Sequence, residues 1–401
     1  MPSDSALRTR VAIVGAARTP IGRYLGSLRE IPPPRLGAHV ARAALERARI
    51  APADVEDVLF GHAIQAGAGQ NPARQVGRWA GVPDPAGATT VNMVCGSGMK
   101  ALHLGVAEIR AGAASIVLTG GMESMSRAPY LVSGEARWGF HFADRSLEDA
   151  MQRDSLKDAY GEHELMGLTG ERIAEKFGLT RAEIDAYAVR SNHRAAEAAE
   201  RGIFDAEIVP VPEGLVGGSK ALARDECVRA DTTLAGLARL PPAFRPDGVL
   251  TAGNSSKLSD GAAAIVLASE AEVERRSLEP LAWVHSLAVS GVDPADVMES
   301  PIPTVRKHLA AVGLAPGEID RVEHNEAYAS ASLAIQRTFG WADERFNAHG
   351  GAVALGHPIG ASGARIVVTL IHEMLRSHSR RGLATLCMGG GNGLSTLLER
   401  A

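Results

Sequence analysis

The feature that most constrains the fold of this chain is an internal repeat. The second part of the sequence follows the plan of the first at an offset of about 265 residues. Residues 36–49 and 305–312 both have helical apolar spacing, and an Ala-Pro helix start follows each of them, at Ala51 and Ala315. A short strand, a glycine-rich helix start and a second buried strand come next in both copies. Four elements in the same order are not a chance match, so the sequence predicts two similar halves.

Both halves alternate strands with helices. This alternation predicts an α/β fold, with mixed and mainly parallel sheets that are covered by helices and related by a pseudo-twofold axis. Strand 116–118 is expected to close at Gly120 and Gly121, as strand 383–388 closes at Gly389–Gly391. The matching elements are strands 58–60 and 321–323, helix starts Cys95–Gly98 and Gly360–Gly363, and strands 116–118 and 383–388.

The middle of the chain has no counterpart in the second copy. It is more polar than either copy and carries helical patterns at 171–177 and 181–201, so we expect an inserted domain there. The predicted boundaries are 1–127 together with 255–278 for the N-terminal half, 128–254 for the inserted domain, and 279–401 for the C-terminal half.

The bulk composition excludes several classes of protein. The net charge of −4 argues against a nucleic-acid binder, which usually carries a basic excess. No stretch approaches the roughly 20 apolar residues of a membrane span, and the first eight residues lack the apolar segment of a secretory signal. Three widely spaced cysteines do not form a disulfide framework. We therefore expect a soluble cytoplasmic protein.

Cys95 is the strongest candidate for chemistry. It lies between the end of an expected strand and the start of an expected helix, and Gly-Ser-Gly follows it. The positive end of a helix dipole favours the thiolate form of a cysteine, and the glycines let a substrate approach the backbone amides. The alternative is a buried core cysteine, which is common in proteins. The sequence predicts that Cys95 is a nucleophile.

Two residues of the second half complete a possible site. Cys387 ends the strand that matches 116–118, and His357 immediately precedes the glycine-rich helix start that matches that of Cys95. If the halves pack about a pseudo-twofold axis, both helix starts and both strand ends meet at the centre. Cys95, His357 and Cys387 would then share one pocket as a nucleophile, a base and a second proton-transferring thiol.

Other motifs are weaker. Cys227 lies in the polar insertion without a His or Gly context. His163-Glu164 and His372-Glu373 lack the second histidine, four residues after the first, that a zinc-protease motif needs. Residues 389–393 are rich in glycine but lack the spacing of a dinucleotide loop at a helix start. We therefore expect no metal ion and no permanently bound cofactor.

The chain resembles the thiolase family from Val11 almost to its C-terminus. The nucleophile segment from Asn92 to Ala101, with its Cys-Gly-Ser-Gly-Met-Lys core, is similar to that of the biosynthetic, short-chain thiolases. Seven segments carry the resemblance in the family's order: residues 69–74, 92–101, 120–126, 251–256, 325–329, 350–358 and 387–393.

The resemblance implies a two-step ping-pong reaction. Cys95, activated by His357, would hold the acyl group of an acyl-CoA as a thioester. Cys387 would remove or return the α-proton of the acetyl-CoA that condenses or is released. Asn325 would fix a water that forms one oxyanion hole with His357, and the backbone N–H groups of Cys95 and Gly389 would form the other. Such preorganised donors are commonly worth roughly 3 kcal/mol each.

The resemblance also identifies the inserted domain as the family's loop domain, which holds coenzyme A or acetyl-CoA as a substrate. It further implies a homotetramer, a dimer of dimers, built through a protruding loop near residues 131–149. The residues matched to coenzyme A contacts are Arg229, Leu240, Phe244 and Ser256, and Met166 matches a residue that lines the acyl pocket. Four residues depart from the usual pattern, namely Met93, Gly236, Lys257 and His349.

Several functions agree with these features. The first hypothesis is an acetyl-CoA C-acetyltransferase of lipid or fatty-acid metabolism, and the second is a 3-ketoacyl-CoA thiolase for longer chains in β-oxidation or aromatic catabolism. A non-catalytic, thiolase-like CoA-binding protein would be expected to lack one of the two thiols. A cysteine hydrolase would not need Cys387, and a ketoacyl synthase typically uses a pair of histidines, or His and Asn, in place of a second cysteine.

Overall fold

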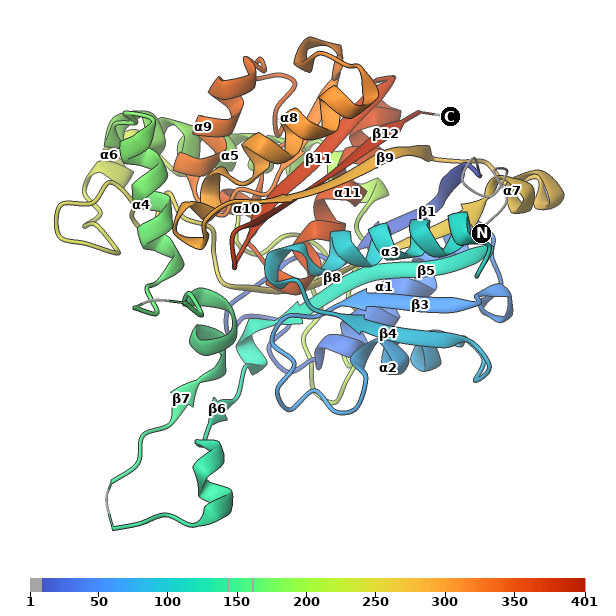
Figure 1. Cartoon of the computed structure of the whole chain (residues 1–401), viewed down its shortest axis with the longest axis horizontal. Helices are drawn as coiled ribbons and strands as arrows, with labels where there is room; N and C mark the ends of the chain where they lie inside the picture. The colour runs from blue at the N-terminus through green and yellow to red at the C-terminus, as the bar shows by residue number, and fades with distance from the viewer. Residues whose placement is uncertain (1–8, 143, 161, 401) are drawn as a thin grey trace.

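The computed structural model describes residues 9–142, 144–160 and 162–400 (Figure 1). Residues 1–8, on which the expectation of no secretory signal rests, lie outside this set. The strands are β1 (Val11–Arg18), β2 (Gly22–Arg23), β3 (Asp57–Gly61), β4 (Gly87–Val91), β5 (Ile116–Ser124), β6 (Tyr130–Leu131), β7 (Glu148–Asp149), β8 (Ser259–Ser269), β9 (Ala282–Gly291), β10 (Arg321–His324), β11 (Arg381–Met388) and β12 (Asn392–Glu399). The α-helices are α1 (Pro33–Ala48), α2 (Pro72–Ala80), α3 (Ser97–Ala111), α4 (Met166–Lys176), α5 (Arg181–Glu200), α6 (Leu234–Ala238), α7 (Glu270–Arg276), α8 (Pro301–Val312), α9 (Ala329–Phe339), α10 (Ala352–Leu355) and α11 (Ile359–Arg376).

The expected repeat is visible in the strand order of the main sheet. Its strands run β10-β11-β12-β9-β1-β8-β5-β3-β4, with β2 attached to β8. Outward from the β1–β9 contact, the first half gives β1, β8, β5, β3 and the second half gives β9, β12, β11, β10. Two residue pairs, Ala12 with Trp283 and Ile13 with Ala282, form that contact. The predicted α/β fold of two similar halves is confirmed.

The sheet is mixed, and its parallel pairs lie away from the centre. β3 pairs in parallel with β4 and β5, and β10 pairs in parallel with β11. The pairs that involve β1, β8, β9 and β12 are antiparallel. The expected parallel pairing is therefore limited to the outer strands. In the second half, β12 follows β11 after a short glycine turn, and such short connections join antiparallel strands.

β5 is longer than the sequence analysis expected. The prediction that this strand closes at Gly120 and Gly121 is wrong, because its pairing with β8 continues as far as Ser124. The two glycines serve close packing instead. A Cβ atom at Gly121 would lie 2.2 Å from the carbonyl oxygen of Gly360, at the start of α11. This close approach brings the first turn of α11 directly onto β5.

Helices α3 and α11 lie between the two halves and form the centre of the molecule (Figure 1). Glycines allow these helices to touch backbone to backbone. A Cβ atom at Gly98 would lie 2.9 Å from the backbone nitrogen of Ala364, and one at Gly363 would lie 2.6 Å from that of Met99. The starts of the two helices therefore meet, as the pseudo-twofold arrangement predicts.

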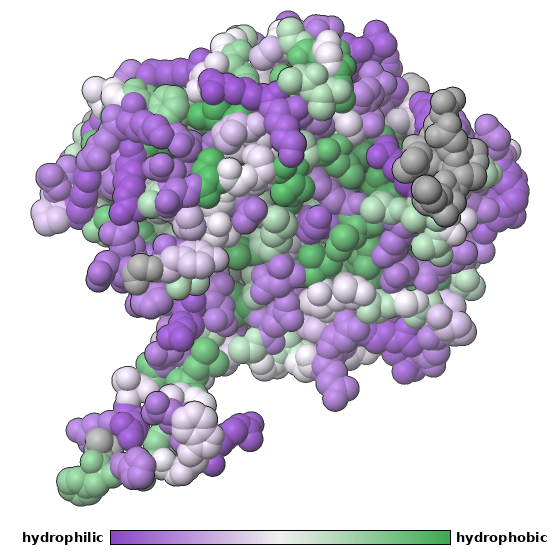
Figure 2. All heavy atoms as spheres, in the orientation of Figure 1, coloured by the Kyte–Doolittle hydropathy of each residue, from purple (hydrophilic) through white to green (hydrophobic). Residues whose placement is uncertain are grey.

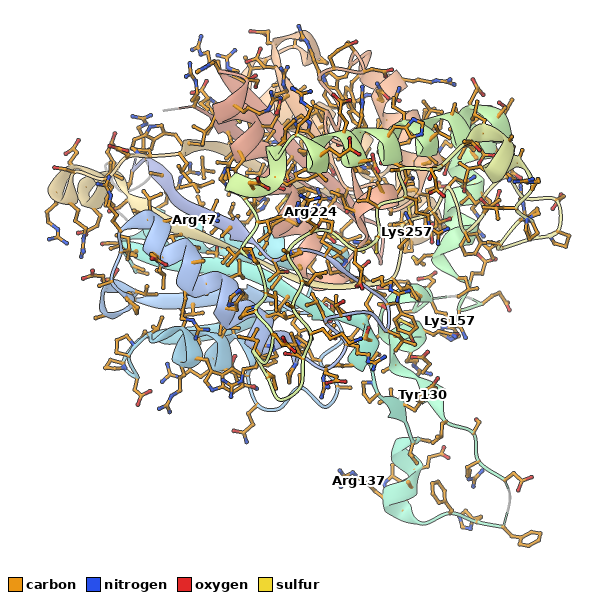
Figure 3. The ribbon with its side chains drawn as sticks, turned by 180° about the vertical axis from the view of Figure 1, so that it is seen from behind. Arg47, Tyr130, Arg137, Lys157, Arg224 and Lys257 are labelled. Carbon is orange, nitrogen blue, oxygen red and sulfur yellow. The ribbon has the colours of Figure 1, made fainter. Side chains whose placement is uncertain are left out.

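The inserted segment carries α4, α5 and α6, which lie beside the second half, and an arm that stands away from the body (Figures 1 and 2). We use "the arm" for the described residues of 130–149. β6 and β7 pair at its base, and Figure 3 shows Tyr130 there and Arg137 on the short helix farther out. Its exposed apolar side chains are Tyr130, Val132, Trp138, Phe140, Phe142 and Leu147.

In residues 9–142, 144–160 and 162–400, no helix has both the length and the apolar character that crossing a bilayer requires.

Candidate active site

Cys95 lies in a strained turn that joins β4 to α3. Val94–Gly96 forms one 3-10 turn, and Val94 has a φ of 48°, a region that β-branched residues rarely occupy. Two side chains hold this turn. Asn92 Oδ1 accepts the Val94 N–H at 3.0 Å, and Ser97 Oγ donates to the Val94 carbonyl at 2.6 Å. The side chain of Cys95 is thereby directed toward the start of α11.

His357 faces Cys95 across the junction of the two halves. Its Nε2 lies 3.3 Å from Cys95 Sγ, and its Nδ1 lies 2.6 Å from Ser362 Oγ. Ser362 Oγ donates its own hydrogen to the Pro358 carbonyl at 2.9 Å, so it accepts from Nδ1–H. The lone pair of the imidazole is then on Nε2, where a base for the thiol must have it.

Burial sets the resting charges of this pair. It raises the pKa of Cys95 to about 12, although the nearby Gly389 backbone favours the thiolate. It also lowers the pKa of His357 to about 3. Desolvation therefore outweighs the favourable effect of the helix start and of the backbone N–H groups on the thiolate. The resting site holds a neutral thiol beside a neutral imidazole.

Cys387 reaches the same region from the end of β11. Its Sγ lies 3.6 Å from Met298 Sδ, and it is buried. Burial raises the pKa of Cys387 to about 12, and the charge of a Cys95 thiolate would raise it further. The pKa of Tyr328 is likewise raised by burial and by both thiols. The two cysteines are thus close enough to influence each other electrostatically.

Asn325 and Gly389 complete the set of predicted site residues. Asn325 Nδ2 lies 3.4 Å from His357 Nε2, and no described protein group bonds its Oδ1. Gly389 follows β11 directly, and its backbone lies close enough to Cys95 to lower the thiol pKa. The structure therefore brings all five predicted catalytic residues to the junction of the halves.

A cavity of about 1210 Å³ leads from His357 to the surface beside the inserted segment. All five residues matched to coenzyme A or acyl contacts line it, and so does Tyr328. They are Met166, Arg229, Leu240, Phe244 and Ser256. These side chains come from separate stretches of the chain, and the fold gathers them in the lining of one cavity.

Two of the four unusual residues lie in this cavity. Gly236 and Lys257 line it, together with Cys227. Lys257 Nζ donates to the Val353 carbonyl at 2.6 Å, and burial lowers its pKa to about 8. The other two lie elsewhere: Met93 packs against the core, and His349 pairs with Glu373 at 2.6 Å.

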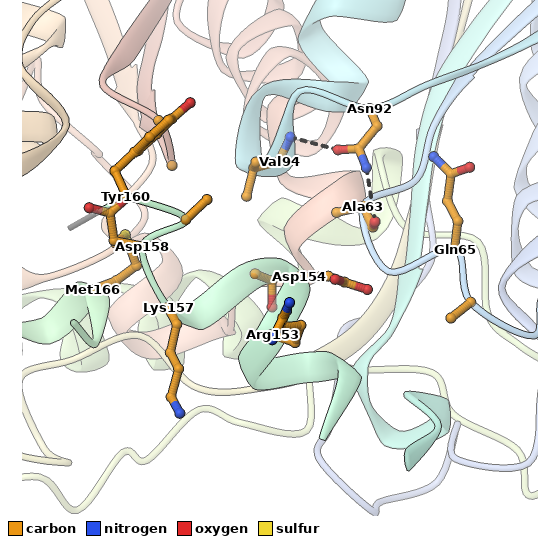
Figure 4. A pocket seen from close by; sticks show the side chains of 15 residues that line it. Ala63, Gln65, Asn92, Val94, Arg153, Asp154, Lys157, Asp158, Tyr160 and Met166 are labelled. Atoms are coloured by element: carbon orange, nitrogen blue, oxygen red, sulfur yellow. Dashed lines mark hydrogen bonds between the residues drawn. The ribbon is translucent and has the colours of Figure 1, made fainter. Parts of the chain in front are cut away.

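A second cavity, of about 600 Å³, adjoins the nucleophile turn (Figure 4). Val94 and Gly389, which both lie next to Cys95, are part of its lining, and so is Met166. The remaining lining is rich in polar side chains. They are Gln65, Asn92, Arg153, Asp154, Ser155, Lys157, Asp158 and Tyr160.

Sequence reasoning assigned no role to two residues that organise this site: Asn92 and Ser362. Asn92 lies in a segment that carried the family resemblance, and Ser362 lies in the expected helix start Gly360–Gly363. A serine five residues after a candidate base, at a helix start, was an available signal. The described residues contain no group of three or more His, Cys, Asp or Glu side chains suited to a metal ion.

Comparison with protein families agrees with this geometry. The model of the thiolase N-terminal domain matches residues 11–271, and that of the thiolase C-terminal domain matches residues 278–400. An acetyl-CoA acetyltransferase of Pseudomonas aeruginosa is 48% identical over 97% of this chain and 99% of its own length. One of Cupriavidus necator is 46% identical over 98% of this chain and all of its own length.

Solved structures agree as well. A Bacillus anthracis acetyl-CoA acetyltransferase superposes with a TM-score of 0.95 at 39% identity, covering 98% of this chain and 99% of its own. Human mitochondrial 3-ketoacyl-CoA thiolase in complex with CoA superposes with a TM-score of 0.94 at 37% identity, with the same coverage. The fold, the paired thiols at the junction of the halves and these matches lead to one conclusion: the chain belongs to the thiolase family.

Proposed function

We propose that this protein is an acetyl-CoA C-acetyltransferase, which joins two acetyl-CoA molecules to give acetoacetyl-CoA and CoA, or catalyses the reverse thiolysis. One observation carries the proposal. His357 Nε2 faces the Cys95 thiol at 3.3 Å where the large cavity ends, and Cys387 lies beside them. The names of its relatives, acetyl-CoA acetyltransferases over almost their full length, support it.

The first half-reaction transfers an acetyl group to Cys95. His357 Nε2 takes the thiol proton while the sulfur attacks the acetyl-CoA carbonyl carbon. The bond between the acetyl carbon and the CoA sulfur then breaks, and the imidazolium returns the proton to the departing CoA thiolate. A thiol with a pKa of about 12 needs such an adjacent base, because almost none of it ionises unaided at neutral pH.

The second half-reaction forms the carbon–carbon bond. The Cys387 thiol first gives its proton to the neutral His357 imidazole, and the Cys387 thiolate then removes an α-proton from a second acetyl-CoA. The resulting enolate carbon attacks the thioester on Cys95. The bond between the acetyl carbon and Cys95 breaks, and the released Cys95 thiolate takes up the proton held by His357, while the α-proton stays on Cys387. Burial suits Cys387 to this step, since a thiol with a pKa of about 12 has a strongly basic thiolate.

Two groups of donors would stabilise the negative charge that develops on oxygen. The backbone N–H groups of Cys95 and Gly389 would bind the tetrahedral oxyanion on Cys95. Asn325, with a water and His357, would bind the enolate oxygen of the second acetyl-CoA. Such donors act strongly in a site from which bulk water is excluded, and His357 and Asn325 are both buried.

The five residues along the large cavity would hold coenzyme A. Arg229 would face the phosphates, Phe244 and Leu240 would cover the apolar part, and Ser256 would bond the pantetheine chain near His357. Met166, which lines both cavities, would bound the acyl group. The three cysteines are free thiols, and this supports the proposal of a cytoplasmic protein.

The direct test is CoA-dependent loss of acetoacetyl-CoA with the purified protein. Saturable thiolysis, with acetyl-CoA as product, is the expected result. A folded protein that binds CoA but catalyses no thiolysis of any 3-ketoacyl-CoA would contradict the proposal and support a non-catalytic CoA-binding relative.

We expect a strong preference for short acyl chains. The cavity that adjoins the nucleophile turn is lined mainly by polar and charged side chains, so a long apolar chain placed there would desolvate them without replacing their hydrogen bonds. The expected kcat/KM for acetoacetyl-CoA is at least about 100-fold that for 3-oxohexadecanoyl-CoA. Equal values for the two substrates would assign the protein to the longer-chain thiolases.

We also propose a homotetramer, a dimer of dimers, held by the arm. The arm exposes six large apolar side chains away from the body, and exposed apolar clusters of this kind mark association surfaces. Deleting residues 132–147 and joining β6 to β7 through Gly-Gly is expected to halve the assembled mass measured by light scattering. A deletion variant that stays tetrameric, or a full-length protein that is dimeric, would contradict this role.

A further inference from the structure

Glu123, near the end of β5, is a fully buried carboxylate with no role in the proton transfers described above. Its two oxygens accept backbone hydrogen bonds from two separate parts of the chain. Oε2 accepts from Ala63 N at 3.1 Å and from Gly360 N at 3.0 Å, while Oε1 accepts from Ile64 N at 3.4 Å. Oε1 also lies 3.1 Å from Nε2 of the buried His62. One side chain therefore joins the loop after β3 to the first turn of α11.

The contact with Gly360 fixes the segment that carries the base. Gly360 is in the first turn of α11, three residues after His357. A Cβ atom at Gly360 would lie 2.6 Å from the Met122 carbonyl and 2.9 Å from Ala63 N, so only glycine allows the helix to come this close. Glu123 thus holds the start of α11, and with it His357, against β5.

The contact with Ala63 leads to the nucleophile. The carbonyl of Ala63 accepts from Asn92 Nδ2 at 3.1 Å, and Asn92 Oδ1 accepts from Val94 N at 3.0 Å (Figure 4). Val94 is the strained residue immediately before Cys95. An unbroken series of hydrogen bonds therefore runs from Glu123 through Ala63 and Asn92 to the nucleophile turn.

We propose that Glu123 is a positioning residue that, with Asn92, sets the distance between Cys95 Sγ and His357 Nε2. Its Oε2 atom is decisive, because this one atom binds both the base segment, at Gly360, and the nucleophile segment, at Ala63. The proposal deepens the proposed function, since the distance it fixes is the one across which the first proton moves.

Two substitutions of Glu123 distinguish positioning from simple stability. Glu123→Gln keeps an oxygen that can occupy the Oε2 position, so kcat for acetoacetyl-CoA thiolysis is expected to fall by no more than about threefold. Glu123→Met keeps the length of the side chain but removes both acceptors. Its kcat is expected to fall about 100-fold, with KM for CoA within about twofold, because a displacement of about 1 Å can cost that much.

A second readout does not need a CoA substrate. Iodoacetamide reacts with the thiolate of Cys95, which His357 must generate, so its rate of alkylation, followed by mass spectrometry, reports the same distance. This rate is expected to fall in parallel with kcat in Glu123→Met and to recover in Glu123→Gln. If the native protein lacks thiolase activity, the alkylation rates still decide the positioning role independently.

Glu171 provides a matched control. It is also fully buried and accepts two backbone hydrogen bonds, from Val249 N and Leu250 N, and within the described residues it makes no hydrogen bond to the segments that carry Cys95 or His357. Glu171→Met is expected to lower thermal stability to a similar degree while leaving the alkylation rate of Cys95 within about twofold of native. Equal losses of alkylation rate in Glu171→Met and Glu123→Met would overturn the proposal.

Asn92 keeps the test decisive if Glu123→Met does not fold. Its side chain is exposed, so Asn92→Ala is expected to fold while releasing both Val94 N and the Ala63 carbonyl. The expected result is at least a tenfold slower alkylation of Cys95. An alkylation rate equal to that of the native protein would show that this series of hydrogen bonds does not set the distance.

Discussion

Replacing Cys95 with alanine is expected to abolish acetoacetyl-CoA thiolysis and also the formation of any acetylated enzyme. The reaction requires a covalent thioester, and the loss of a nucleophile that acts as a unit with its base typically costs on the order of 10⁴-fold or more. Incubation with acetyl-CoA followed by intact-protein mass spectrometry measures the acetylated fraction, and thiolysis of acetoacetyl-CoA measures turnover.

The Cys95→Ala variant should keep its fold and its affinity for CoA. The Cys95 side chain makes no hydrogen bond that holds the nucleophile turn, which depends instead on Asn92 and Ser97. Thermal unfolding and calorimetric CoA binding close to native values are therefore the controls. An acetyl group found on this variant would place the nucleophile elsewhere in the chain.

Replacing Cys387 with alanine is expected to separate the two half-reactions. The enzyme should still become acetylated on Cys95, because His357 and the donors around that thiol remain. Condensation and thiolysis should fall by about 10³- to 10⁴-fold, since Cys387 is the group that the proposed mechanism assigns to the transfer of the α-proton. Intact-protein mass spectrometry and steady-state assays on one preparation measure both quantities.

This separation also distinguishes between reaction classes. A cysteine hydrolase would keep full turnover without Cys387, so an active Cys387→Ala variant would support that alternative. A variant that cannot even be acetylated would show that Cys387 takes part in the first half-reaction as well. Replacement by serine is expected to recover little activity, because a hydroxyl is a much weaker acid than a thiol and would form almost none of the anion that removes the α-proton.

Much of the fold was predictable because each repeated element is indicated by a short, local sequence pattern. Helix starts at Ala51 and Ala315 and apolar spacing along α1 and α8 depend on neighbouring residues alone, and the structure confirms these elements. The short helix α2 was missed, because its start at Pro72 lies within a stretch whose glycines indicate a loop. The end of β5 was also misplaced, because glycines needed for packing resemble glycines of a turn.

The candidate site was predictable in its residues but not in its electrostatics. The positions of Cys95, His357 and Cys387 in matching elements were sufficient to predict that they meet. The thiol pKa was not predictable, because it depends on burial by side chains from both halves. Glu123 was not identified either, because hydrogen bonds to backbone groups across long sequence separations leave no pattern in the chain.

The symmetric order of strands and helices around the β1–β9 contact has an evolutionary consequence. Two equivalent helix starts meet at the centre, yet one carries the proposed nucleophile Cys95 and the other follows the proposed base His357, and only the second copy ends its strand in a thiol. Because the scaffold occurs twice, positions related by the pseudo-twofold axis can carry different residues. No single helix start has to supply both the nucleophile and the base. The two copies form an obligate pair in this sense, because neither copy alone holds all of the proposed catalytic groups.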